Sequence, residues 1–357
     1  MGKHLPKLDG IRAIAAGLVV VYHVGLDLIP GGMGVLIFFV LSGFLITWLL
    51  LQEHQKTGTI SIGKFYARRS LRIFPAFYVF WLVVTGYTLV RGLRVNWPQG
   101  VSSLAYVSNY YQGLNQYPLG AYSHTWSLAV EEQFYLLYPV GLLFLLRFPR
   151  RVPWVLGGLI LAVWALRLTS ELVLGVHDAY LYTAFEMRAD HLLIGCLLAV
   201  LLYRGYLDGA WRFFQKLPAG VLVTVGLMAV SLLAWRIEGG TRYRNTIGFI
   251  IDPLLVAVLL LQLLASGRSV LTRWLDNRVI RYLGTISYPM YLYHGLVVAA
   301  AKGFMTWLGA PLVVSGIVAG LAVVGAASAS YYLVEKPFLR LKGRFATASH
   351  AAEPKRS

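Results

Sequence analysis

Ten long apolar runs, separated by polar connections, constrain the fold of this chain more than any other feature. They cover residues 11–29, 34–52, 72–91, 126–146, 154–172, 182–204, 218–236, 246–266, 286–308 and 312–334. A helix that crosses a bilayer needs about 20 residues. Only 13% of the residues are charged, whereas a soluble domain carries about 25%. The sequence therefore predicts an all-α fold, a polytopic membrane helix bundle of about ten transmembrane helices.

The basic residues predict the orientation of this bundle. With the N-terminus in the cytoplasm, 24 of the 32 Lys and Arg residues fall on the inner side and six on the outer side. This distribution obeys the positive-inside rule and puts both termini in the cytoplasm. The net charge of +17 then reflects orientation and contact with anionic membrane lipids, so no nucleic-acid partner is expected.

The chain is expected to form one membrane domain over residues 1–345, followed by a disordered cytoplasmic tail over residues 346–357. The stretch 92–125 is predicted to be an outer loop or a re-entrant segment. No small-x-small cleavage site follows the first apolar run, so this run is expected to remain as an uncleaved span. The lone Cys196 excludes an intrachain disulfide and a thiolate metal cluster. We expect an inert buried thiol there and predict no metal site.

The first apolar run contains an arginine and a histidine, Arg12 and His23, eleven positions apart. At about 100° per residue they share one helix face, roughly 16 Å apart along the membrane normal. Ionisable side chains inside a span are costly, and by default they indicate a functional site that faces the protein interior. The pair therefore predicts a site that is entered from one side of the membrane and acts nearer the other.

Polar side chains on four separate runs are predicted to lie at one depth, roughly 8–13 Å below the outer surface. They are His23, Glu131, Glu132, Arg188, Asp190, His191 and Asp252. Charges at a common depth can pair, so this layer is either a functional site or a structural ion-pair network. Arg167 and Glu171 are spaced i, i+4, are predicted to pair with each other, and are left out of the layer.

Within the layer, His23 is the expected proton acceptor, because histidine changes its protonation near neutral pH. A carboxylate partner would fix its tautomer and support the imidazolium that forms. Glu131 and Glu132 differ by about 100° around their helix, so only one of them is expected to face His23.

A basic segment opens the third apolar run. Arg69 and Arg72 are spaced i, i+3 and follow Arg68, so the first two share a helix face at the predicted cytoplasmic boundary. Guanidinium forks suit phosphate groups. These arginines are therefore either a phosphate-binding site or ordinary positive-inside anchors.

Seven sequence motifs, in order along nearly the whole chain, resemble those of the acyltransferase-3 family of integral membrane O-acyltransferases. They are Arg12 with His23, similar to an Arg-x10-His signature; FFVLSGFLI at 38–46; Arg69-x-x-Arg72; HTWSLAVEEQFY at 124–135; the segment 188–195; the segment 286–294; and VEKPF at 334–338. Each motif alone is a weak signal, whereas seven in the same order are specific.

The resemblance implies acyl-coenzyme A, usually acetyl-CoA, as a cytoplasmic donor substrate, with no cofactor bound permanently. It implies a glycan or glycolipid acceptor with a hydroxyl on the outer side, and a place in the bacterial cytoplasmic (inner) membrane. Some family members append an extracytoplasmic hydrolase-like domain, and this sequence ends soon after its tenth apolar run. We therefore expect either direct transfer by the bundle or a separate extracytoplasmic transferase that finishes the reaction.

On this resemblance, the basic segment with Arg68 would hold the phosphates of coenzyme A, and His23 would deprotonate the acceptor hydroxyl. Glu131 or Glu132 would support His23, Arg12 would line the donor path, and an acyl-histidine intermediate stays open. Roles in substrate contact or in structure are expected for Ser42, Trp126, Ser127, Arg188, Asp190 and His294. The main alternative is a transporter of a small polar or anionic substrate; inverted repeats would favour it, and none is detected.

Overall fold

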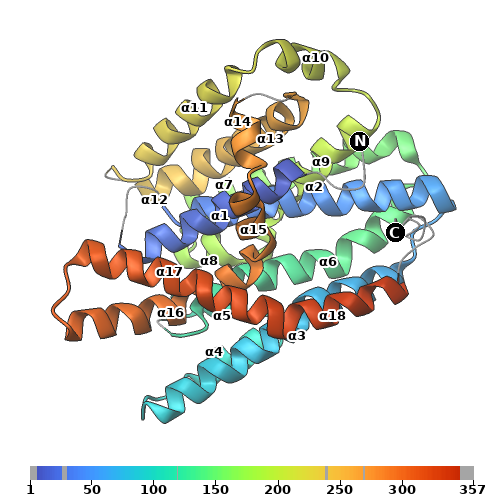
Figure 1. Cartoon of the computed structure of the whole chain (residues 1–357). Helices are drawn as coiled ribbons and strands as arrows, with labels where there is room; N and C mark the ends of the chain where they lie inside the picture. The colour runs from blue at the N-terminus through green and yellow to red at the C-terminus, as the bar shows by residue number, and fades with distance from the viewer. Residues whose placement is uncertain (1–5, 26–29, 119, 238–239, 268–269, 346–357) are drawn as a thin grey trace.

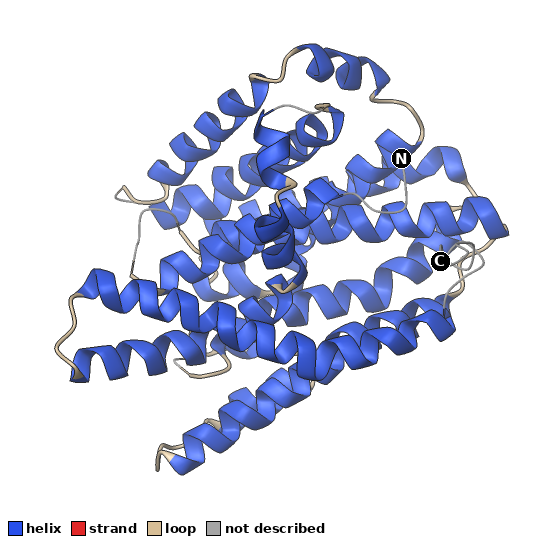
Figure 2. Ribbon diagram, in the orientation of Figure 1, coloured by secondary structure: helices blue, strands red, loops and turns tan. Residues whose placement is uncertain are grey.

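The computed structural model describes residues 6–25, 30–118, 120–237, 240–267 and 270–345. Within these ranges all regular secondary structure is helical, and no strand is formed (Figure 2). The helices pack against one another in a single bundle (Figure 1). The prediction of an all-α helix bundle is therefore confirmed.

Each predicted apolar run corresponds to a helix. These helices are α1 (Pro6–His23), α2 (Gly32–Thr57), α3 (Ile62–Val90), α6 (Trp126–Leu145), α7 (Val152–Leu172), α9 (Phe185–Tyr203), α11 (Gly220–Ala234), α13 (Phe249–Ala265), α16 (Ser287–Trp307) and α17 (Leu312–Ser330). The largest difference from the predicted boundaries is at α3, which begins ten residues early and so includes the whole basic segment. Hydropathy misses this start because Lys and Arg are polar and lower the mean hydropathy of the segment. Both residues are nevertheless good helix formers.

Shorter helices fill the connections. They are α4 (Trp97–Leu104), α5 (Ser108–Leu114), α8 (Asp178–Thr183), α10 (Asp208–Lys216), α12 (Gly240–Tyr243), α14 (Val270–Leu275), α15 (Arg278–Thr285) and α18 (Lys336–Leu341), with 3-10 or π turns at 123–125, 149–151, 244–248, 331–335 and 342–345. The stretch 92–125 contains α4 and α5, which have eight and seven residues. Neither is long enough to cross a membrane, because a crossing needs about 20 residues.

Six helical stretches in the described part of the chain are long and apolar enough to cross a membrane. A seventh follows if the bent pair Asp178–Tyr203 and Asp208–Lys216, at 93° to each other, is one span. The chain is thus a multi-pass membrane protein. The count of ten spans and the cytoplasmic position of both termini stay predictions, and the expected tail 346–357 lies outside the described residues.

Helix α2 is the most buried of these six stretches, and it crosses α9 at very close range. A methyl group on Gly43 would lie 2.8 Å from the carbonyl carbon of Leu192, and one on Gly195 would lie 2.8 Å from the backbone nitrogen of Phe44. Such small residues let two helix backbones approach each other in a membrane. The buried Cys196 thiol lies at the same crossing, 3.4 Å from the Gly43 carbonyl oxygen. This crossing fixes the position of α2 along its axis relative to α9, and α2 carries part of the site.

Candidate functional site

A cavity of about 440 Å³ lies between helices α1, α2, α3, α6 and α16. Its volume is in the range of ligand pockets, about 300–1,000 Å³. The polar residues in its lining include Asp9, Arg12, Ser42, Glu53, Lys56, Arg68, Arg69, Arg72, Ser127, Glu131, Glu132, Tyr135, Ser287, Tyr288 and Tyr291. The structure thus brings together Arg12, the basic segment of α3 and both glutamates of α6 around one space.

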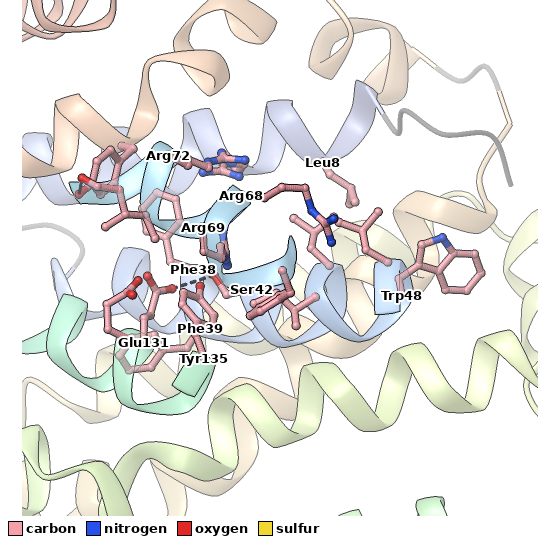
Figure 3. A pocket seen from close by; sticks show the side chains of 18 of the residues that line it. Leu8, Phe38, Phe39, Ser42, Trp48, Arg68, Arg69, Arg72, Glu131 and Tyr135 are labelled. Atoms are coloured by element: carbon pink, nitrogen blue, oxygen red, sulfur yellow. Dashed lines mark hydrogen bonds between the residues drawn. The ribbon is translucent and has the colours of Figure 1, made fainter. Parts of the chain in front are cut away.

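The three arginines of α3 line this cavity, and Arg69 lies close to Tyr135 of α6, whereas Arg68 points away from Tyr135 and Glu131 (Figure 3). The Arg69 guanidinium lies 3.9 Å from the centre of the Tyr135 ring, which is a cation–π contact. Arg68 forms an ion pair with Glu53 at 3.1 Å and also donates to the carbonyl oxygen of Phe345 at 3.0 Å. The Arg68 guanidinium is therefore already bonded within the protein, whereas Arg69 lines the cavity and its Nε has no hydrogen-bond partner among the described residues.

Arg12 and Glu131 are held on the cavity wall by serine side chains. The Arg12 side chain donates to the Ser287 hydroxyl of α16 at 3.3 Å. The Ser42 hydroxyl of α2 donates to the Glu131 carboxylate at 2.7 Å (Figure 3). Ser42 thus has a direct polar role beside a candidate catalytic group. Glu132 also lines the cavity.

The expected pair between His23 and a glutamate is not formed. In the part of the chain that the structure describes, no hydrogen bond joins His23 to Glu131 or Glu132, and His23 is not in the lining of the cavity. Its exposed ring instead lies 4.4 Å, centre to centre, from the ring of His294. A direct bond between His23 and a glutamate is therefore excluded here, whereas the predicted bond through one water stays a prediction. A common depth fixes only one coordinate. It leaves open the direction in which each side chain points around its helix.

Tyr291 of α16 stands between the cavity and these histidines. Its hydroxyl lies 2.5 Å from the Ser127 hydroxyl and donates to the His124 carbonyl oxygen at 3.0 Å. Its ring contacts the rings of His294, at 5.4 Å, and of His124, at 5.8 Å. One aromatic layer therefore separates the arginine-lined cavity from the histidines, and Ser127 anchors that layer.

The other members of the predicted layer form separate groups. Asp190 accepts from Arg167 at 2.9 Å and from Trp164 at 2.9 Å, and it lies 2.8 Å from the His191 ring nitrogen. The predicted pair of Arg167 with Glu171 is therefore wrong, and Glu171 accepts instead from an asparagine side chain at 3.1 Å. Spacing i, i+4 makes such a pair possible. Asp190 on α9 is fully buried, however, and a buried carboxylate without a cation is strongly destabilising, so Arg167 pairs with Asp190 instead.

Arg188 and Asp252 are buried apart from the cavity. The Arg188 guanidinium lies 3.9 Å from the centre of the Phe249 ring and 5.8 Å from that of Trp126, and among the described residues it has no hydrogen-bond partner. The Asp252 carboxylate faces the side chains of Ser231 and Trp235. The predicted layer is therefore not one network but several local clusters.

Sequence reasoning gave no role to Ser287, Tyr291 or His124, all of which contact the site. The sequence did contain a signal for Ser287 and Tyr291. Ser287, Tyr291 and His294 are spaced i, i+4, i+7, which places them on one face of a helix. His124 lies just before α6, and its position beside α16 depends on the packing of two distant segments.

Comparisons with known proteins agree with this arrangement of motifs. The family model described as "Acyltransferase domain" matches residues 5–331. The chain is 31% identical over 311 residues to the peptidoglycan O-acetyltransferase OatA of Listeria monocytogenes, covering 82% of this chain and 49% of that protein. It is 29% identical over 359 residues to the O-acetyltransferase OatA of Staphylococcus aureus, covering 96% of this chain and 58% of that protein. The chain thus spans about half the length of these relatives. No solved structure matches.

Proposed function

The chain belongs to the acyltransferase-3 family of membrane O-acyltransferases, and on that premise we propose that it moves an acyl group, acetyl in the first instance, from acyl-CoA to a glycan hydroxyl. The observation that carries the proposal is the cavity in which Arg12, Arg69 and Arg72 face carboxylates of α6. The acceptor is an extracytoplasmic or lipid-linked glycan, and peptidoglycan is the first candidate because it appears in the name of one relative. The membrane is the bacterial cytoplasmic membrane.

The arginines of α3 are the proposed donor-binding residues. A coenzyme A molecule carries several phosphate charges, and planar guanidinium groups bind phosphate oxygens through paired hydrogen bonds. Arg69 and Arg72 point into the cavity, and Lys56 extends the basic lining toward the turn between α2 and α3. By the positive-inside rule this end of the cavity faces the cytoplasm, where the donor would enter.

His23 is the proposed general base. The acceptor oxygen attacks the thioester carbonyl carbon, the carbon–sulfur bond breaks, and the thiolate leaves with its electron pair. The hydroxyl proton passes to Nε2 of His23 and ends on the thiolate. Because Tyr291 separates the cavity from His23, the thioester must reach the histidines past this side chain. Arg12 and Glu131, held by Ser287 and Ser42, would then orient the acyl end of the donor.

The experiment that tests this proposal uses the purified chain in lipid vesicles, with acetyl-CoA and soluble peptidoglycan fragments. Free thiol is measured with a chromogenic disulfide, and acetylated fragments are measured by mass spectrometry. We expect thiol release and acetylated product to appear together and to require both substrates. A transporter would move a substrate without breaking the thioester, so the absence of any thiol release would contradict the proposed enzyme.

A further inference from the structure

Three histidines from different parts of the chain gather where α1, α6 and α16 meet. The ring of His294 lies between the other two, 4.4 Å from the ring of His23 and 4.9 Å from that of His124. His294 is buried, whereas His23 is exposed at the end of α1. The described residues contain no group of histidine, cysteine or acidic side chains with the geometry to hold a metal ion. The cluster is therefore considered for proton chemistry.

Backbone carbonyl groups fix the tautomer of each neutral ring. His23 donates from Nδ1 to the carbonyl oxygen of Val19 at 2.8 Å, and His294 donates from Nδ1 to that of Tyr291 at 2.5 Å. His124 donates from Nε2 to the carbonyl oxygen of Leu292 at 2.9 Å. A carbonyl oxygen can only accept, so each bonded nitrogen carries the hydrogen. The other nitrogen of each ring is left with a lone pair.

Among the described residues, no carboxylate forms a hydrogen bond or ion pair with His23. Glu131 is occupied by Ser42 on the cavity side of Tyr291. Lys302 donates to the carbonyl oxygen of His23 at 3.2 Å. The N–H that His23 gains when it takes a proton needs an acceptor. The His294 ring lies 4.4 Å away, centre to centre, and carries a lone pair on Nε2.

We propose that His294 is the positioning residue for His23, and that its Nε2 accepts a hydrogen bond from the N–H that His23 gains during acyl transfer. His294 thus takes the place that a carboxylate holds beside many catalytic histidines. The inference rests on the proposed function, since it assigns His23 the proton. His124 supports His294 from the opposite side, and Tyr291 fixes the His294 ring through its carbonyl oxygen.

Two substitutions of His294 separate this role from simple packing. His294→Gln keeps a donor and an acceptor, whereas His294→Leu fills the space without any polar atom. A hydrogen bond to a charged group is worth roughly a ten- to hundredfold change in rate. We expect kcat to fall by about that factor in His294→Leu with the KM for acetyl-CoA unchanged, and to recover in part in His294→Gln.

A control variant and a second apolar variant distinguish a positioning role of His294 from a packing role. His177→Leu changes an exposed histidine at the start of α8 and should leave kcat unchanged. If His294→Leu does not yield folded protein, His294→Phe takes its place as the apolar variant. A packing role predicts the opposite order, with the apolar variant as active as His294→Gln or more so, and that order would overturn the inference. A wild-type chain that releases no thiol would contradict the proposed function instead.

Discussion

Replacing Gly195 with alanine would put a methyl group into the closest approach between α2 and α9. Its Cβ would lie 2.8 Å from the Phe44 backbone nitrogen and 2.9 Å from the Val40 carbonyl carbon, whereas Cβ contacts in proteins are rarely below about 3.4 Å. Both neighbours are backbone atoms, so no side chain can rotate away. One helix must therefore move by at least about 0.5 Å.

This displacement predicts both a loss of stability and a change at the site. Overpacking of a tight core costs about 1–3 kcal/mol, and we expect the upper half of that range because the contact is with backbone. Ser42 lies on α2 at the same level and holds Glu131 at 2.7 Å. A shift of α2 by about 0.5 Å would stretch this bond past the usual range for two oxygens, about 2.5–3.0 Å. Acyl transfer should fall as well.

The assay is thermal unfolding in detergent, followed by thiol release for the same samples. Gly157→Ala on α7 is the matched control, because a methyl group there would meet nothing within 4 Å. In that open position alanine should favour the helix by up to about 1 kcal/mol over glycine. The reasoning is refuted if Gly195→Ala unfolds at the same temperature as Gly157→Ala.

Two further substitutions test the donor site and the buried ion pair. Arg72→Lys should raise the KM for acetyl-CoA, because an ammonium group cannot replace a guanidinium fork on phosphate. Lys64→Ala changes an exposed basic position on the same helix and should leave this KM unchanged. Equal KM values in the two variants would mean that Arg72 only anchors the helix at the membrane boundary. Arg167→Leu should lower stability by about 3–5 kcal/mol, because it leaves the buried Asp190 without its arginine. Thermal unfolding checks this, and a stability equal to that of Glu171→Leu would contradict it.

The sequence predicted the helices well because each apolar run ends near charged, glycine or proline residues. The resemblance to the acyltransferase-3 family implied that Arg12, Arg69 and Glu131 belong to one site, whereas position alone left Arg69 as either a phosphate-binding residue or a positive-inside anchor. The structure confirms that these three side chains line the same cavity. Their chemical roles stay predictions.

The partners of individual side chains could not be predicted, because the rotation of each helix depends on tertiary packing. His23 was expected beside a glutamate and instead lies against His294. Arg167 was expected to bond within its own helix and instead reaches Asp190 on α9. In both cases the sequence allowed the expected pair, but the packing of the helices against one another determined which side chains came into contact. Contacts between segments far apart in sequence are set by that packing.

The central claim is that His23 carries the proton in acyl transfer from a thioester bound in the arginine-lined cavity. The most direct test measures thiol release from acetyl-CoA by vesicles that contain wild-type, His23→Ala or His177→Ala protein. We predict that His23→Ala lowers the rate by about 10²–10⁴-fold while acetyl-CoA still binds, and that His177→Ala behaves as wild type. Thiol release by folded His23→Ala protein as fast as that of His177→Ala would contradict the account.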